Sequence, residues 1–430
     1  MSYSNGDDGL HLDKSGERLH VISPSTETSD NIDAFFRRNG FHVETRAICD
    51  KFARDRFPSA IVDPIPSQGY CSYTLRVGSD KVLQFRPDAF PINVGIIPEG
   101  RKTLGNLVPG IEGLGEVHGI RTDQDDQRSD ELSAFLLDRV AGITLEDLHL
   151  AVSGDEKRML HLKRRLVSDL AVVFGKTYLS SRAVSPKGIN VPQKGKVGSS
   201  LAWRVRLLQG VVSEEVSTVL AQVRGSLSEI ENLPWCLTHG DLVPANIMLD
   251  PSTGRLCGLI DWAEGEYLPF GVGLYGLEEV LGTTQGGHFQ YHSFHRLLRA
   301  EFWLRFHGYL CGQGVHIGTS EFQCIMLARK LGILLWRGIA FAEGRIDRVV
   351  EVGVDDGELH KLHLFLAEDD VTFTGGCGEN CQWSRQIQSA PGCTRKMSTL
   401  VWKACSGVFR GMRALYQSVQ ASLSLHYSKG

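Results

Sequence analysis

The 430-residue chain lacks any long, uninterrupted apolar run. Its most apolar segment, Cys324 to Ala342, is interrupted by Arg329, Lys330 and Arg337, so we expect a buried core helix rather than a membrane span. A strong net charge is also missing: at −4, the chain gives no general reason to expect nucleic-acid or membrane binding. The first eight residues have neither a basic start nor an apolar centre, and no secretory signal is expected.

The ten cysteines show no metal-binding spacing. Cys377 and Cys381 form a C-x-x-x-C pair, but Cys393 and Cys405 follow singly, which argues against a zinc site. Several others lie in apolar segments, where a free cysteine behaves as a small buried hydrophobe; these are Cys236, Cys257, Cys311 and Cys324. The pattern fits a reducing compartment, and we expect a cytoplasmic protein.

The most informative stretch is residues 239–262, HGDLVPANIMLDPSTGRLCGLIDW. Apolar runs flank a polar turn at 250–255, which predicts a β-hairpin. Asn246 opens the first strand and Asp261 closes the second, so antiparallel pairing should bring an amide oxygen and a carboxylate together. Magnesium prefers such hard oxygen ligands. Asp241 lies in a loop stiffened by Pro244, where it could accept a hydrogen bond from an acceptor hydroxyl in line with a phosphate.

This stretch resembles the catalytic loop and metal-binding aspartate of the aminoglycoside phosphotransferase and choline kinase superfamily, small-molecule relatives of protein kinases. The matching residues are His239, Gly240, Asp241, Asn246, Asp261 and Trp262. The alternative is a hairpin with ordinary turn aspartates, but six matches at fixed spacing favour the catalytic interpretation.

The resemblance implies a protein-kinase-like bilobal α+β fold, with a small antiparallel β-sheet N-lobe and a mainly helical C-lobe. It further implies ATP- and Mg²⁺-dependent transfer of phosphate to a hydroxyl of a small molecule. In that reading Asp241 accepts the hydroxyl proton, Asn246 and Asp261 hold Mg²⁺, and His239 braces the loop through hydrogen bonds.

The nucleotide side departs from the kinase pattern. Short strands are expected at 61–65, 71–77 and 81–86. Their first connection has a single glycine, Gly69, in place of Gly-x-Gly-x-x-Gly, so phosphate contact falls to Ser67, Gly69 and a few backbone N–H groups. The third strand lacks the phosphate-binding lysine. We expect Arg86, on the same face as Gln84, to replace it, because a guanidinium binds phosphate bidentately; the alternative is a surface arginine at a strand end.

Two further features of the nucleotide side follow from the resemblance. Glu99, in the region of the small-lobe helix at 90–106, is the acid placed to pair with Arg86. The strand at 132–140 resembles the linker between lobes, where backbone groups of Asp138 and Val140 would read the adenine edge. A helix N-cap at Thr144, with Asp147 three residues on, is compatible with this reading.

We expect a disordered N-terminus (1–30), a small lobe with preceding helices (31–140), a large lobe (141–366) and a basic tail (367–430). Large-lobe helices are predicted at 155–181, 211–231, 289–311, 321–343 and 358–366, with an insertion or flexible loop at 183–200. In the tail, residues 400–419 have an amphipathic pattern, which favours docking on the protein body over contact with an anionic membrane.

No long activation segment or Ala-Pro-Glu anchor follows Trp262, which favours a small-molecule hydroxyl acceptor over a protein substrate. Four glutamates beyond the hairpin could hold a cationic substrate, with Trp336 or Tyr275 stacking on it, although solvated helix faces are the commoner explanation; they are Glu264, Glu266, Glu278 and Glu279. The poor glycine loop and missing lysine leave an alternative function, a catalytically weak kinase-like binding or scaffold protein. The sequence predicts neither the acceptor's identity nor the oligomeric state.

Overall fold

The computed structural model describes residues 32–65, 68–122, 129–182, 191–210, 213–342 and 345–368. These divide into two compact units. Unit 1 comprises the described residues up to 91 together with 112–137, and unit 2 comprises 92–111 together with the described residues from 138 onward. Residues 92–111, which the sequence placed in the small lobe, therefore group with the larger unit.

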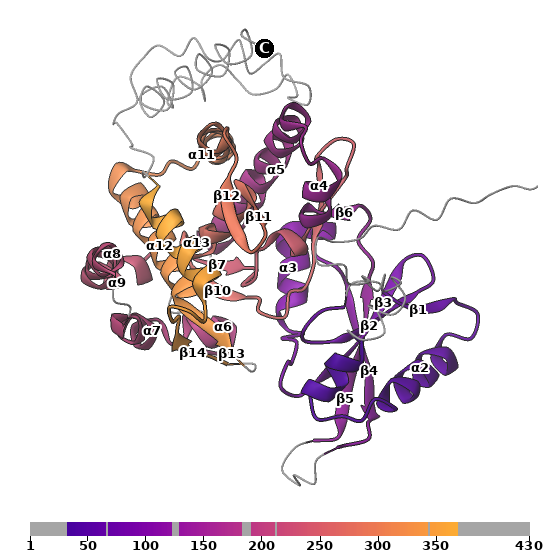
Figure 1. Cartoon of the computed structure of the whole chain (residues 1–430). Helices are drawn as coiled ribbons and strands as arrows, with labels where there is room; N and C mark the ends of the chain where they lie inside the picture. The colour runs from indigo at the N-terminus through magenta and orange to yellow at the C-terminus, as the bar shows by residue number, and fades with distance from the viewer. Residues whose placement is uncertain are drawn as a thin grey trace, which may run out of the picture. The chain divides into compact units, whose positions relative to one another are not determined.

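Unit 1 is built on one five-stranded sheet in the order β1-β2-β3-β5-β4 (Figure 1). Its strands are β1 (Val62–Pro64), β2 (Tyr73–Val77), β3 (Lys81–Pro87), β4 (Ile111–His118) and β5 (Glu131–Asp138). The three strands expected between 61 and 86 are confirmed, and β1–β2 and β2–β3 pair antiparallel. The sequence did not reveal β4, because Gly113 and Gly115 interrupt its apolar pattern.

Two helices complete unit 1, one at residues 32–38 and α2 (Thr45–Arg56). Both lie before the strands of the small lobe, where the sequence predicted helices. Aromatic side chains from the first helix and from the sheet share one core, in which the Phe36 and Tyr73 rings lie 5.3 Å apart. The Tyr73 hydroxyl also donates to Asp50 Oδ1 at 2.7 Å, which ties α2 to β2.

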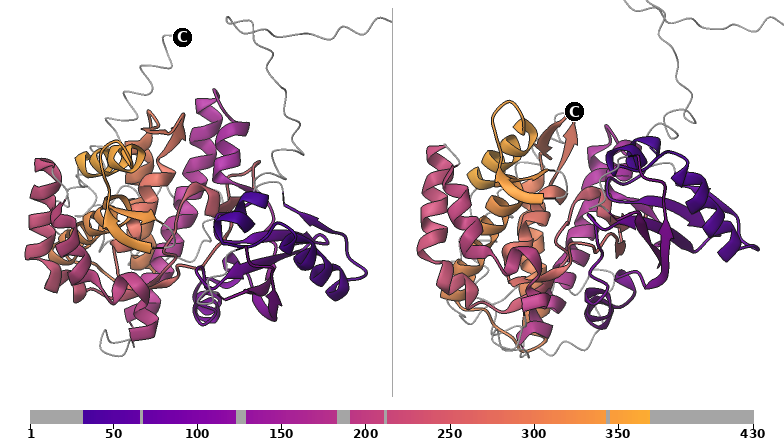
Figure 2. Two further views of the ribbon diagram at one scale, coloured as in Figure 1. Left: turned by 60° about the horizontal axis from the view of Figure 1, so that its bottom comes forward. Right: turned by 90° about the horizontal axis from the view of Figure 1, so that it is seen from below.

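Unit 2 is mainly helical (Figures 1 and 2). The long helix α5 (Glu156–Arg182) packs against α11 (His295–Gly312), and α12 (Thr319–Gly338) packs against α8 (Glu214–Gly225) and α13 (Asp356–Ala367). The shorter helices are α3 (Ile96–Leu104), α4 (Leu145–Ala151), α6 (Val191–Gly198), α7 (Leu201–Leu207), α9 (Leu227–Glu231) and α10 (Tyr275–Val280). Thr144 caps α4 in a capping box with Asp147, as expected.

Short strand pairs lie between these helices. They are β7 (Trp235–Thr238) with β10 (Glu266–Pro269), β6 (Ile143–Thr144) with β8 (Ile247–Leu249) and β9 (Leu256–Leu259), β11 (Gly282–Gln285) with β12 (His288–Tyr291), and β13 (Ile339–Ala342) with β14 (Arg345–Val349). The predicted hairpin is confirmed as β8–β9, with Ile247 opposite Leu259.

Every predicted large-lobe helix is present, but three have different limits. The helix expected at 211–231 is divided into α8 and α9, the one expected at 289–311 begins at His295 after strand β12, and the one expected at 321–343 ends at Gly338 and continues as β13. Residues 288–291 and 339–342 pair with partner strands instead, a choice that periodicity cannot show. Of the insertion or flexible loop expected at 183–200, residues 191–198 form helix α6 instead. The expectations for residues 1–30, 183–190 and 369–430 lie outside the described residues.

The predicted α+β class is confirmed, with an antiparallel sheet in the N-terminal region and a mainly helical C-terminal region. Among the described residues, no helix is both long and apolar enough to cross a membrane. The six cysteines within the described ranges are free thiols, and Cys236 and Cys311 are buried as expected.

Candidate active site

Two loops of unit 2 carry the catalytic residues expected from the sequence. The first, residues 239–246, joins β7 to β8, and the second, residues 260–265, joins β9 to β10. Pairing of β7 with β10 sets Thr238 opposite Glu266 at one end of both loops. At the other end, the Ile260 N–H donates to the Asn246 carbonyl at 3.0 Å. The two loops are therefore held together at both ends by backbone hydrogen bonds.

His239 links the two loops through its side chain. Its Nε2 lies 2.8 Å from the Ile260 carbonyl oxygen, and the Asp241 N–H donates to Nδ1 at 3.3 Å. Burial lowers the pKa of His239 to about 4, so the ring is neutral at pH 7. With the proton on Nε2, the neutral ring satisfies both hydrogen bonds, which fits a bracing role.

Asp241 has a carboxyl group that is more basic than usual. Burial raises its pKa to about 6, and the nearby Asp261 and Glu264 charges act in the same direction, while Arg337 and Asn246 oppose them. The Asn246 side-chain Nδ2 donates both to Asp241 Oδ2 at 2.8 Å and to the Asp241 carbonyl at 2.9 Å. The carboxylate is thus oriented, ionised at neutral pH and suited to accept a proton.

The residues predicted to hold magnesium flank this aspartate. Asn246 uses its amide nitrogen on Asp241, which leaves its amide oxygen as the end that can bind a cation. Asp261 is exposed and has φ 57°. Among the described residues it is the one non-glycine residue with positive φ, a conformation that aspartate tolerates better than most and that often marks functional sites. This pair of hard oxygen donors fits Mg²⁺.

Gly240 is required by the close approach of the two loops. Its φ is 79°, and a Cβ added there would lie 2.0 Å from the Glu264 carbonyl oxygen. A side chain at this position would push the loop carrying Asp241 away from the loop carrying Asp261. The glycine of the His-Gly-Asp motif therefore has a steric reason in this fold.

The predicted nucleotide residues of unit 1 are engaged within that unit. Arg86 is 2% exposed, so the alternative of a surface arginine is wrong. Its Nε donates to the Phe90 carbonyl at 2.8 Å and its Nη1 to Gln84 Oε1 at 3.3 Å, consistent with the shared face expected for these two side chains. The Gly69 carbonyl accepts from Arg38 Nη2 at 3.4 Å. Ser67 lies outside the described residues.

The two predicted linker residues lie in unit 2. The Asp138 N–H donates to the Gly110 carbonyl at 3.0 Å. The Asp138 carboxylate accepts from the Gly110 N–H at 2.8 Å and from Arg101 Nη1 at 3.1 Å. A Cβ at Gly258 would lie 2.9 Å from Val140 Cγ1, so Val140 packs closely on that backbone. The Asp138 N–H thus already donates a hydrogen bond within the protein, to the Gly110 carbonyl.

The predicted cation-binding role is wrong for three of the four glutamates, because they are buried against internal partners. Glu278 lies 2.6 Å from Arg299 Nη2 and 2.7 Å from Arg329 Nη2. Burial acts to raise the pKa of Glu278, but the two arginines lower it to about 2. Glu279 pairs with Arg337 at 2.6 Å. The remaining buried glutamate, Glu266, accepts the Gly198 N–H at 2.8 Å, and Glu264 alone of the four is exposed.

The two aromatic residues offered for cation stacking instead contact each other and the catalytic loop. Tyr275 and Trp336 stack with ring centroids 4.5 Å apart. Trp336 Nε1 donates to the Gly240 carbonyl at 2.6 Å, and the Leu242 N–H donates to the Tyr275 hydroxyl at 3.0 Å. Sequence reasoning missed this support, because no local pattern links residues that are 33 or 96 positions apart.

The sequence model described as "Phosphotransferase enzyme family" matches residues 112–272, which contain both catalytic loops. The predicted resemblance to this superfamily is confirmed. No curated protein sequence is similar enough to match the chain.

Several solved structures resemble the chain. Aminoglycoside 2′-phosphotransferase-IIIa, in complex with GDP, is 15% identical, covers 74% of this chain and 97% of its own, and has a TM-score of 0.47. The type VIII aminoglycoside-3′-phosphotransferase is 18% identical, with coverages of 67% and 100% and a TM-score of 0.40. A Streptomyces rimosus aminoglycoside phosphotransferase, APH(3″)-Id with ADP and streptomycin, is 15% identical, with coverages of 67% and 98% and a TM-score of 0.39.

Proposed function

We propose that this protein is an ATP- and magnesium-dependent phosphotransferase that adds phosphate to a hydroxyl of a small molecule. The observation that carries the proposal is the geometry around Asp241. Its carboxylate is oriented by Asn246, has a pKa of about 6 and lies on a loop that His239 ties to the Ile260 carbonyl, next to Asp261 in the second loop. A carboxylate of this basicity can accept the hydroxyl proton as the phosphate is transferred.

Each residue of the site has its own proposed role. Asp241 orients the hydroxyl and accepts its proton, His239 braces the two loops, and Asn246 and Asp261 would hold Mg²⁺. When bound, the metal would neutralise charge on the phosphate oxygens. Arg86 is the candidate for gripping the nucleotide phosphates, together with backbone groups near Gly69.

The family match supports the proposed chemistry, and the free thiols support the proposed compartment. The match spans both catalytic loops and ends before α10, so it supports the chemistry and leaves the acceptor open. Free thiols at all six described cysteines are consistent with a reducing compartment, for which we propose the cytoplasm.

The test is ADP release from magnesium-ATP, measured alone and with an added pool of aminoglycosides, choline, homoserine and sugars. The wild-type chain should release ADP faster with at least one acceptor. Asp241→Asn should lower the acceptor-dependent rate of ADP release by about 10²-fold or more, because the amide cannot take the proton. Asp250→Asn is the matched control, since Asp250 lies in the turn of the same hairpin and contacts Ser252 there. Equal rates for wild type and Asp241→Asn would refute the proposal.

One observation favours a second candidate, a kinase-like binding or scaffold protein with weak catalysis. The buried Arg86 guanidinium donates to Phe90 and Gln84 in unit 1, so at least two of its five donors serve the protein instead of a phosphate. Thermal unfolding with millimolar ATP and magnesium separates the candidates, because ligand binding to the native state must raise its stability. A rise in Tm favours the phosphotransferase, and no rise favours the scaffold.

A further inference from the structure

The loop carrying Asp241 is held by hydrogen bonds on both sides of this residue. Before it, the Gly240 carbonyl accepts from Trp336 Nε1 at 2.6 Å, and after it, the Leu242 N–H donates to the Tyr275 hydroxyl at 3.0 Å. We propose that Tyr275 and Trp336 form an aromatic clamp that positions Asp241 for proton transfer. This inference rests on the proposed function and assigns positioning residues to it.

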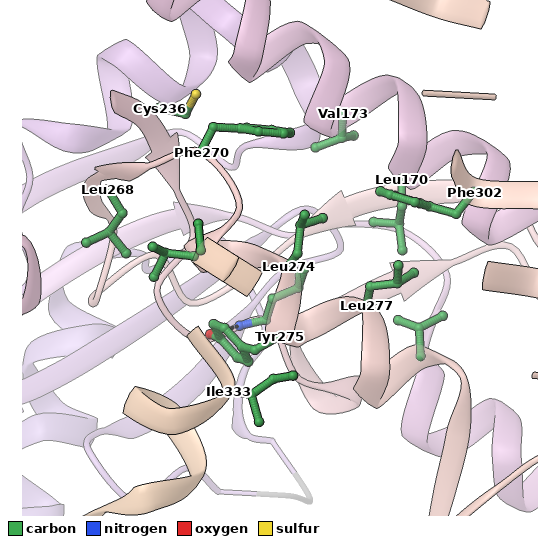
Figure 3. Packing of buried hydrophobic residues seen from close by; sticks show 14 of the residues in the cluster. Leu170, Val173, Cys236, Leu268, Phe270, Leu274, Tyr275, Leu277, Phe302 and Ile333 are labelled. Atoms are coloured by element: carbon green, nitrogen blue, oxygen red, sulfur yellow. Dashed lines mark hydrogen bonds between the residues drawn. The ribbon is translucent and has the colours of Figure 1, made fainter. Parts of the chain in front are cut away.

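The clamp is one stacked unit built from two helices. Tyr275 begins α10 and Trp336 lies near the end of α12, and their rings stack at 4.5 Å with an interplanar angle of 13°. Tyr275 is 0% exposed, and Figure 3 shows it among Leu274, Leu277 and Ile333 in the core. A ring fixed in this way can hold its hydroxyl in one place, and the stack fixes the second ring in turn.

A small cavity borders the loop. It is lined by His239, Gly240, Leu242 and Tyr275 together with core side chains such as Leu170 and Phe174. Backbone that borders a void lacks the dispersion contacts that would otherwise fix it. The two hydrogen bonds from the clamp therefore add to the restraint that the hydrogen bonds of His239 and Asn246 place on Asp241.

The test uses conservative variants that keep the stack and remove one hydrogen bond each. Trp336→Phe removes the donor to Gly240, and Tyr275→Phe removes the acceptor for Leu242. Each should lower kcat for ADP release from magnesium-ATP by about 10- to 100-fold, since small misplacements of a reacting group are costly. The KM for ATP should stay within about twofold, because both hydrogen bonds of the clamp go to the catalytic loop. A second readout, hydrogen exchange of the peptide covering 239–246, should become faster in both variants.

Trp303→Phe is the matched control. Trp303 is a tryptophan of unit 2 that is fully buried where Trp336 is partly buried, and its Nε1 has no hydrogen-bond partner among the described residues. This variant loses packing volume without losing a hydrogen bond to the loop. It should leave kcat and the exchange of 239–246 unchanged even if Tm falls.

The outcomes separate the clamp from the proposed function. Trp336→Phe with wild-type kcat and wild-type exchange would overturn the clamp, as would an equal loss of kcat in Trp303→Phe. If the wild-type chain releases no ADP, the phosphotransferase proposal fails, and the exchange measurement alone then decides whether the two rings restrain the loop. Faster exchange confined to the two clamp variants supports the clamp in either case.

Discussion

The residues assigned to the nucleotide and those assigned to catalysis differ in what their polar groups contact. Arg86 is buried and donates to Phe90 and Gln84 within its own unit. Asp241 and Asp261, by contrast, share one small region, and their mutual repulsion contributes to the raised pKa of Asp241. Clustered like charges cost stability and are kept mainly where function needs them, whereas a buried arginine bonded to a backbone carbonyl and a side-chain amide is ordinary structure.

This difference teaches which half of the site the chain is built around. The catalytic half keeps features that cost stability, namely adjacent acids and a positive φ at Asp261. The nucleotide half shows no such cost in unit 1. The comparison predicts that substitutions in the catalytic half change the rate of transfer, and that substitutions in the nucleotide half act on ATP binding or on stability.

The largest effect is expected for Asp261→Ala. Loss of this carboxylate would remove a proposed magnesium ligand, and with it the cation that would offset the phosphate charge, so kcat should fall by about 10³-fold or more. Removing repulsion with Asp241 should leave Tm unchanged or higher. Steady-state ADP release and a thermal melt of the same preparation check both parts. Full activity in this variant would show that the catalytic half is not the site.

Gly240→Ala should have the next largest effect. The added methyl would meet the Glu264 carbonyl oxygen, so the two loops must separate. We expect kcat to fall by about 10²-fold, because Asp241 moves away from its partner loop. Gly105→Ala is the matched control, since Gly105 also has a positive φ and nothing lies within 4 Å of an added Cβ. Equal losses in the two variants would attribute the effect to backbone strain instead of to the contact with Glu264.

Arg86→Gln tests the nucleotide half. If Arg86 grips phosphate, the KM for ATP should rise about tenfold while kcat changes little, as for the loss of one charge-assisted contact. Arg76→Gln is the control in the same sheet, because Arg76 is half exposed and pairs with Asp63 on the neighbouring strand. An unchanged KM together with a lower Tm would make Arg86 purely structural and would strengthen the scaffold alternative.

The smallest expected effect is a stability difference in Asp241→Asn. The folded-state pKa is raised from 3.8 to about 6, so the native state binds this proton more tightly than the unfolded state does. Stability therefore falls as pH rises from about 4 through 6, and the loss persists above pH 6. Replacing the carboxylate should raise stability at pH 7.5 by about 1 kcal/mol, after allowance for partial exposure, and by less at pH 4. Thermal melts of both proteins at the two pH values give the result, and an equal difference at both would contradict the pKa assignment.

The hairpin and its catalytic residues were predictable because the interactions that form them are local. Asn246 and Asp261 lie just beyond the paired ends of β8 and β9, which are joined by a short polar turn. The capping box at Thr144 is likewise contained within four residues. Patterns of this range are fully written in consecutive residues, so the sequence could be read correctly there.

The partners of the glutamates and aromatics were not predictable in this way. Glu278 meets Arg329 across 51 positions and Trp336 meets Gly240 across 96. The sequence offers Glu278 and Trp336 as substrate contacts, because the charge of the first and the aromatic ring of the second fit a pocket as well as they fit a core. The order in which helices pack decides between these uses, and helical periodicity gives only the buried face.

By itself, the sequence determined the α+β class, the hairpin and the set of residues at the catalytic loop, because each depends on local pairing and spacing. The tertiary structure alone decided that Arg86 is buried, that three glutamates serve internal ion pairs and backbone contacts, and that Tyr275 and Trp336 support the loop of Asp241. The physical reason is the same in each case. Burial and long-range hydrogen bonds depend on which elements pack together, and that arrangement is fixed by the whole core instead of by any one segment.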